Sequence, residues 1–171
     1  MPAIPVPDLD DPKELYAFAG LALYQANLLE ASLINLAAVL QLDRVKAITR
    51  EVFESTFNNV EAKTLGQLLR ATRSLTLFPA EVDAVLAAAL NKRNYLAHNF
   101  FRKHADDLIH DSGVSSMITE LASMMTLFQQ ADELVTPLYL SLWQKYGVDE
   151  ATIEAELATA MAEIEAKYSG L

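Results

Sequence analysis

The stretch LYAFAGLALYQANLLEASLINLAAVLQL, from Leu15 to Leu42, decides the fold class of this chain. It contains one charged residue, Glu30, and its apolar residues do not alternate with polar ones as they would in a half-buried strand. Asp11 can cap a helix that begins at Pro12, a residue suited to the first helical position. We therefore predict a helix over 12–41, buried on two sides, with one face in a bundle and another against a neighbouring helix or a second subunit.

A helix this apolar also raises the possibility of a membrane span. Four polar residues in its middle and the absence of flanking basic anchors argue against that interpretation. These residues are Gln25, Asn27, Glu30 and Asn35. A buried Glu30 would need a cation or hydrogen-bond donors, because an unpaired carboxylate is costly to bury; the alternative is that Glu30 is half exposed.

The rest of the chain carries almost no strand signal, with only five glycines and no Asn-Gly or Asp-Gly turn. We predict an all-α fold, an up-and-down bundle of five to six helices. Further helices are expected at 43–57, 64–75, 79–101, 115–146 and 150–168, with a loop over 104–114. Asp43 is the expected cap of the second helix, and Thr64 with Gln67 forms a capping box for the third. We therefore predict that the chain has three parts: a flexible tail over 1–11, a bundle over 12–146, and an acidic helix over 147–171 packed on the bundle or extending from it.

The composition restricts the possible functions. The chain of 171 residues is 52% hydrophobic, which is too apolar for a disordered protein, and it has no cysteine for disulfides or thiolate chemistry. No signal peptide is recognisable at the N-terminus, so a cytoplasmic location is expected. The formal charge of −10 argues against non-specific binding to DNA or RNA. About half of that excess lies after residue 148, however, which leaves room for a local basic site elsewhere.

Such a site is suggested by KRNYLAHNFFRK, from Lys92 to Lys103. At about 100° per residue, six apolar residues fall within roughly 60° of Arg93 on the helical wheel. They are Val82, Leu86, Ala89, Leu96, Ala97 and Phe100. His98 lies about 140° away, with Asn94 one turn before it and able to orient its imidazole by a hydrogen bond. A permanent cation in an apolar stripe needs a partner, and Glu30 is the candidate within the chain.

The segment RNYLAH resembles the signature of the HEPN superfamily, Arg-x4-6-His with a polar residue after the arginine, on a late helix of an all-helical bundle. Many HEPN proteins are metal-independent ribonucleases that act as symmetric dimers. Many also belong to toxin-antitoxin or defence systems, beside an antitoxin or a nucleotidyltransferase. The resemblance implies that Arg93 binds the scissile phosphate, that His98 is the general acid or base, and that Asn94 orients the site. No metal or cofactor is expected.

Other residues within this segment or directly after it are expected to assist. Lys92, Arg102, Lys103 and His104 are candidate RNA contacts. In one branch of the family a tyrosine two residues after the histidine accepts adenylylation, but here that position is Phe100, which has no hydroxyl to modify.

The chain has no metal-binding pattern such as HExxH around its three histidines. The alternative hypothesis is a non-catalytic dimerisation or regulatory module in which Arg93 and Glu30 form a structural buried pair.

Overall fold

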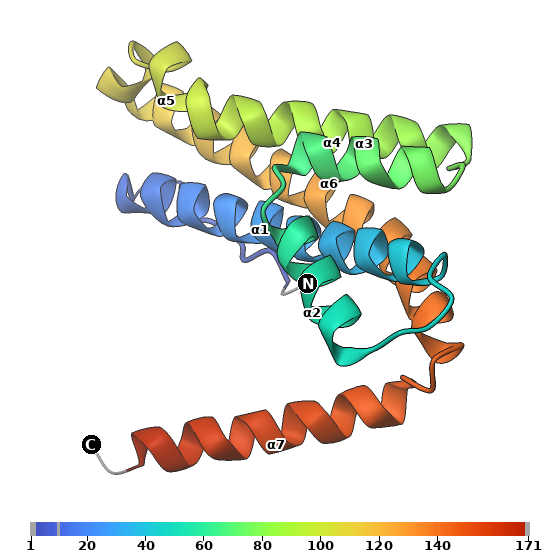
Figure 1. Cartoon of the computed structure of the whole chain (residues 1–171). Coiled ribbons are helices and arrows are strands. Elements are labelled where there is room, and N and C mark those ends of the chain that lie inside the picture. Colours follow the sequence, from blue (N-terminus) through green and yellow to red (C-terminus); the bar gives the residue numbers. More distant parts are fainter. Residues whose placement is uncertain (1–2, 10, 170–171) are drawn as a thin grey trace.

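The computed structural model describes residues 3–9 and 11–169, and its ordered elements in that part of the chain are all helical. In chain order they are α1 (Lys13–Leu42), α2 (Arg50–Glu61), α3 (Leu65–Leu75), α4 (Ala80–His98), α5 (Phe100–Lys103), the 3₁₀ helix η1 (Asp107–Ile109), α6 (Asp111–Gln144) and α7 (Glu150–Tyr168) (Figure 1). The predicted all-α class is confirmed. The described residues form seven α-helices rather than five or six.

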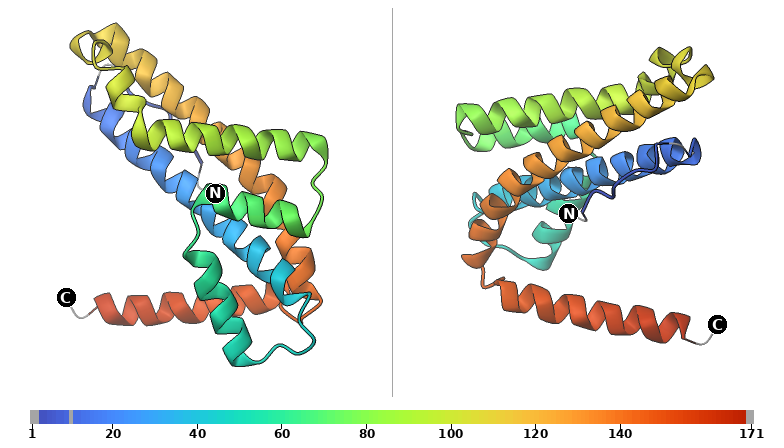
Figure 2. Two further views of the ribbon diagram at one scale, coloured as in Figure 1. Left: turned by 45° about the horizontal axis from the view of Figure 1, so that its top comes forward. Right: turned by 180° about the vertical axis from the view of Figure 1, so that it is seen from behind.

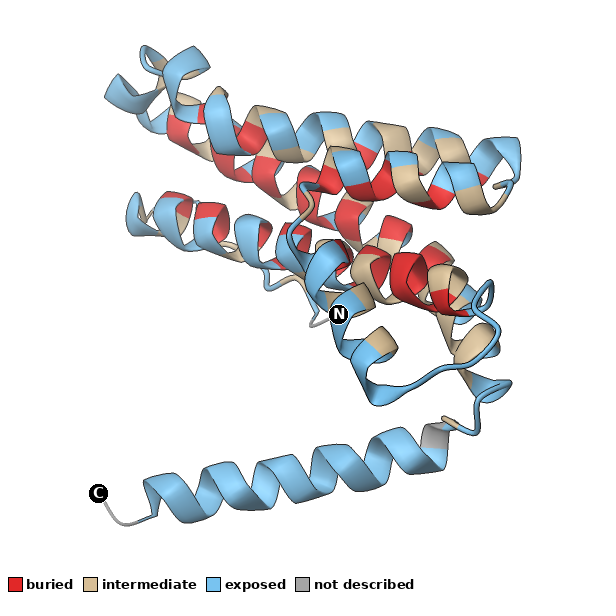
Figure 3. Cartoon of the chain, viewed as in Figure 1, coloured by how far each residue is buried: buried red, intermediate tan, exposed pale blue. Residues whose placement is uncertain are grey.

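The core lies where α1 packs along α6, with α3 and α4 covering the same pair of helices (Figures 1 and 2). Buried residues run along α1 from Leu15 to Leu42 and along α6 from Val114 to Val135. Figure 3 shows that the buried positions of α1, α4 and α6 face one another. By length and hydropathy alone α1 could span a membrane, but half of its most apolar window is buried inside this bundle. The apolar run is therefore used, at least in large part, to build the core.

The start of α2 differs from the prediction. Asp43 is the C-terminal capping residue of α1, and α2 begins only at Arg50. Its cap is Thr49, whose hydroxyl accepts a hydrogen bond of 3.3 Å from the backbone N–H of Val52.

The prediction for α3 is confirmed. Its capping box joins the Thr64 N–H to Gln67 Oε1 at 2.9 Å and the Gln67 N–H to the Thr64 hydroxyl at 3.4 Å.

The predicted helix over 79–101 is interrupted. Helix α4 ends at His98, and Asn99 has φ −131° and ψ −22°, outside the helical region. Helix α5 then continues the chain in a new direction. After the break, the ring of Phe100 is fully buried and contacts the rings of Tyr95, Phe101 and His104. These ring contacts hold α5 against the end of α4.

Helix α6 begins at Asp111, four residues before the predicted start, and the expected loop also contains η1. Ser112 and Gly113 suggested a loop, yet Gly113 is needed for close packing. A Cβ atom there would clash with the carbonyl oxygen of Asp107, so only glycine lets η1 approach the first turn of α6. Asp111 carries a negative charge in that first turn, where it is favourable.

The two ends of the chain behave differently. In the described part of the N-terminal tail, Ile4 packs against the core, and the carbonyl of Leu9 accepts a 3.3 Å hydrogen bond from the hydroxyl of Ser115. Helix α7 extends from the bundle, and its residues 151–168 are all exposed (Figure 3).

Truncating the core is expected to be costly. Phe128 of α6 is fully buried, so Phe128→Ala should lower the free energy of unfolding by about 3–5 kcal/mol, through lost burial and the cavity left behind. Urea denaturation followed by circular dichroism measures this change. Leu77→Ala is the matched control, because Leu77 is 94% exposed and its truncation should change stability by no more than about 0.5 kcal/mol. Equal losses in the two variants would contradict the assignment of the core.

Candidate functional site

The three residues of the Arg-x4-His motif lie on the last two turns of α4, directly before the break at Asn99. Arg93 is only partly exposed, with 26% of its side-chain surface accessible. The buried residues of α4 lie mainly to one side of it, and Ala97, which the wheel places on its other side, is exposed. Arg93 therefore lies at the edge of the apolar stripe, where its guanidinium reaches both α1 and solvent.

The guanidinium of Arg93 has two partners. Its Nη2 atom is 3.5 Å from Oε2 of Glu30 on α1, and its Nη1 atom donates to Oδ1 of Asn94 at 3.4 Å. The cation that Glu30 was expected to need is thus present, although the pair is half buried rather than buried, with 19% of the Glu30 side chain exposed. Since a guanidinium carries five N–H groups, donors remain for another acceptor.

His98 is the last residue of α4 and is exposed. The sequence suggested that Asn94 would hydrogen-bond to it, but the Asn94 carboxamide oxygen contacts Arg93 instead. Within the part of the chain that the structure describes, the His98 imidazole has no hydrogen-bond partner. Its two nitrogens are open to solvent and to any molecule that docks on this end of α4.

A second polar cluster, which we call the His104 cluster, lies beside the motif and consists of Lys92, Tyr95, His104, Asp107 and Glu120. Nδ1 of His104 is 2.6 Å from Oδ2 of Asp107, and Nε2 is 2.9 Å from Oε2 of Glu120 and 3.0 Å from the Tyr95 hydroxyl. Lys92 donates to Oε1 of Glu120 at 3.2 Å. These contacts tie the end of α4 and the α5–η1 segment to α6.

The His104 cluster engages two of the four predicted RNA contacts, Lys92 and His104, within the chain. Both ring nitrogens of His104 are engaged inside the chain, and Lys92 is paired with a carboxylate. Lys103 is exposed and its ammonium lies 5.5 Å from the centre of the Tyr95 ring. Arg102 is exposed and donates to Oδ1 of Asn99. Arg102 and Lys103 are thus the two members of this set with accessible side chains and no carboxylate partner among the described residues.

The outer face of α1 is a feature that the motif did not predict. Tyr16, Gly20, Leu23 and Asn27 recur at helical spacing, are exposed and carry no charge. The same face meets the motif helices at two points: the Tyr16 ring stacks on Phe101 with centroids 6.1 Å apart, and Glu30 reaches Arg93. The signal in the sequence was the uncharged run itself, which is longer than one buried helical face requires.

No group of three or more histidine, aspartate or glutamate side chains suited to a metal ion occurs among the described residues. Comparisons with known proteins add no family, since no protein-family model, curated protein or solved structure matches this chain. The resemblance to HEPN proteins therefore depends on the motif and the helical fold.

The His104 cluster predicts a pH effect. Burial, together with the negative charges of Glu120 and Asp107, raises the pKa of the Tyr95 hydroxyl above its ordinary value of 10.0. Since the folded state holds this proton more tightly than the unfolded state, the contribution of Tyr95 to stability is complete below pH 10.0 and is lost as the pH rises through the folded-state pKa.

The measurement compares the free energy of unfolding of the wild type and Tyr95→Phe between pH 7 and pH 11. Loss of the hydrogen bond to His104 should make Tyr95→Phe less stable by about 1 kcal/mol at pH 7, and that difference should shrink above pH 10. Tyr146, whose pKa is raised mainly by its hydrogen bond to Asp43, is present in both chains and cancels. A difference that stays constant to pH 11 would contradict this description of Tyr95.

Proposed function

We propose that this protein is a metal-independent endoribonuclease of HEPN type that acts as a homodimer. The observation that carries the proposal is the state of Arg93, a half-buried guanidinium oriented by Glu30 and Asn94, on the same two helical turns as the unengaged imidazole of His98. A fixed cation and an accessible proton carrier are the two groups that cleavage of RNA by its own 2′-hydroxyl requires.

In the proposed reaction His98 removes the proton of the ribose 2′-hydroxyl. The 2′ oxygen then bonds to the adjacent phosphorus, and the bond from phosphorus to the 5′ oxygen breaks. The leaving oxygen takes a proton from an imidazolium, and the products are a 2′,3′-cyclic phosphate and a 5′-hydroxyl. Arg93 binds the phosphate oxygens and stabilises their charge through its remaining N–H donors. Imidazole suits both proton transfers near neutral pH.

Glu30 would act as a positioning residue for Arg93. An N–O distance of 3.5 Å is longer than a charge-assisted hydrogen bond of about 2.7–2.9 Å, so the carboxylate orients the guanidinium without saturating it. Arg102 and Lys103 are exposed on α5, the short helix that follows the motif, and would supply positive charge for the RNA strand. The acidic remainder of the surface would limit binding to this end of the molecule.

The homodimer is part of the proposal because the motif is incomplete in one chain. Arg93 and His98 project from α4 about 140° apart, so one chain does not readily direct both at a single phosphate. The uncharged outer face of α1 lies next to Arg93, and Gly20 would allow a second copy to approach closely. Packing this face against its counterpart would place two arginines and two histidines around one cleft.

Other parts of the proposed biology follow from the same resemblance. The substrate class is RNA, the location is the cytoplasm, and a cognate antitoxin or nucleotidyltransferase is a candidate partner. Control by adenylylation at the usual position is not proposed, because Phe100 has no hydroxyl and its ring is buried. The nearby Tyr95 hydroxyl is held by His104.

Cleavage of single-stranded RNA in the presence of a chelator tests the activity. Arg93→Ala and His98→Ala should each lower the cleavage rate by about 10²–10⁴-fold, since each removes a group acting on the reacting atoms. His110→Ala is the matched control, because His110 is exposed and lies outside the motif. Its rate should equal that of the wild type. Cleavage that persists in both motif variants, or that requires a metal ion, would contradict the assignment of Arg93 and His98 as the catalytic site.

The ion pair between Arg93 and Glu30 also favours a second candidate function, a non-catalytic dimerisation or regulatory module. In that case the pair only specifies how α1 and α4 pack. Replacing both residues with apolar ones of similar size, Arg93→Met with Glu30→Leu, should then leave a folded dimer with unchanged binding to its partner, because removing both charges together avoids an unpaired one.

Sedimentation and thermal unfolding of this double variant measure assembly and stability. Under the ribonuclease proposal the double variant also folds and dimerises but loses cleavage. Under the module proposal the wild type itself never cleaves RNA. A double variant that fails to fold, while the single variant Glu30→Gln folds, would contradict simple pairing as the structural role.

A further inference from the structure

Helix α7 carries an apolar stripe with nothing packed along most of it. Its members recur at spacings of four, four, three and four residues, and each is between 40% and 61% exposed. They are Ile153, Leu157, Met161, Ile164 and Tyr168. On a helical wheel they fall within about 80° of one another. Five large side chains exposed to this extent form an apolar patch on the order of 500 Å², a size that usually marks an interaction surface.

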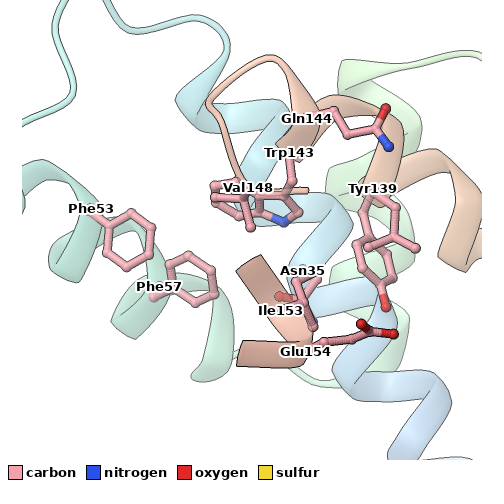
Figure 4. Close-up of a pocket in the computed structure, with 10 residues that line it drawn as sticks. Asn35, Phe53, Phe57, Tyr139, Trp143, Gln144, Val148, Ile153 and Glu154 are labelled. Carbon is pink, nitrogen blue, oxygen red and sulfur yellow. The ribbon is translucent and has the colours of Figure 1, made fainter. Parts of the chain in front are cut away.

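A groove opens at the base of this helix, with a volume of about 720 Å³. Figure 4 shows its walls: Phe53 and Phe57 from α2, Tyr139 and Trp143 from the end of α6, and Ile153 from the first turn of α7. The rings of Phe53 and Phe57 have centroids 4.7 Å apart, and each is 6.2 Å from the Trp143 ring. The groove is therefore aromatic on two sides and ends on the stripe of α7.

Ile153 fixes the direction of the stripe. Because this residue lines the groove and the other four members share its face, the whole stripe faces the space beside α2 rather than away from the molecule. Helix α7 runs apart from the bundle, on the side where α2 lies (Figures 1 and 2). A helix lying in that space would contact the aromatic wall and the α7 stripe together.

The charges around this space indicate what kind of helix fits. Arg44 and Lys46 lie in the connection before α2, are exposed, and have no carboxylate partner among the described residues, whereas Arg50 on α2 is paired with Glu54 at 2.6 Å. The occupant should therefore combine an apolar stripe with acidic flanks. Helix α7 has that composition, since its stripe is flanked by Glu154, Glu156, Glu163 and Glu165 against one base, Lys167.

We propose that the occupant is α7 of a second copy of this chain, in a two-fold arrangement in which the two α7 helices run antiparallel. With the axis near Leu157 and Ala160, Ile164 of the second copy lies opposite Ile153 and enters the groove beside Phe53. Each chain then covers the stripe and fills the groove of the other, which an isologous contact permits. The two patches and two grooves together reach the roughly 1,200 Å² of a specific interface.

This interface is distinct from the outer face of α1 that the proposed ribonuclease would use. A chain that uses both faces forms a larger assembly than a dimer. Loss of the α7 contact would then leave the motif dimer and its cleavage intact, so failure of one proposal is recognisable without failure of the other.

Single thiols test the contact, because the chain has no cysteine of its own. Full-length Phe53→Cys and Ile164→Cys are purified separately, mixed and oxidised with copper phenanthroline. The expected result is a disulfide-linked dimer of the two variants, at a yield at least several-fold above that of the control mixture. The control replaces Ile164→Cys with Ala162→Cys, because Ala162 lies about 180° from Ile153 on the wheel and is also exposed.

Three results would overturn the proposal. One is a yield equal to that of the Ala162→Cys control. Another is linkage within one chain only, in the double variant Phe53→Cys with Ile164→Cys at high dilution, which would mean that α7 folds back on its own groove. The third is loss of the linkage when Leu23→Glu disrupts the outer face of α1, which would make the α7 contact a consequence of the motif dimer. As an independent readout, Leu157→Glu with Ile164→Glu should lower the sedimenting mass, and Ala162→Glu should not.

Discussion

The contact between α1 and α6 builds the core on which α3 and α4 pack. Alanines at 22, 26, 37 and 38 are almost completely buried, and such small side chains let neighbouring helices approach α1 closely. A 2.5 Å hydrogen bond from the Ser32 hydroxyl to Asp132 also joins the two helices. Because the inner face of α1 is committed to this core, its uncharged outer face is not explained by the folding of a single chain.

The packing of α1 also determines where the side chains of the Arg-x4-His motif lie. Glu30 lies on the α1 surface that meets α4, so its carboxylate holds Arg93 at the edge of the bundle. The His104 cluster fixes the other end, where it joins α4 and the α5–η1 segment to α6. His98 lies between these two anchored points with an exposed ring. The half-buried cation and the exposed imidazole project to different sides of α4, which is why the proposed function requires a second copy of the chain.

Local chemistry could be predicted from the sequence, and tertiary contacts could not. Thr64 and Gln67 satisfy each other within one turn, so their capping box was recognisable, and the helical class followed from the missing strand signals. The pair of Glu30 and Arg93 could be anticipated because each was an isolated charge in an apolar run. The break at Asn99 and the early start of α6 are stabilised by the ring contacts of Phe100 and by the contact of Gly113 with Asp107, which join residues by packing. The partners of His104 come from two other segments and left no periodic signal.

The central claim is that the ribonuclease site is completed by a second copy. Mixing Arg93→Ala chains with His98→Ala chains tests it most directly, because a mixed dimer contains one intact Arg93 and one intact His98 contributed by different chains. The account predicts that each variant alone cleaves RNA about 10²–10⁴-fold more slowly than the wild type, and that the mixture regains cleavage as mixed dimers form. A mixture that forms mixed dimers, shown by mass spectrometry of the intact assembly, and still cleaves RNA no faster than either variant alone would contradict it.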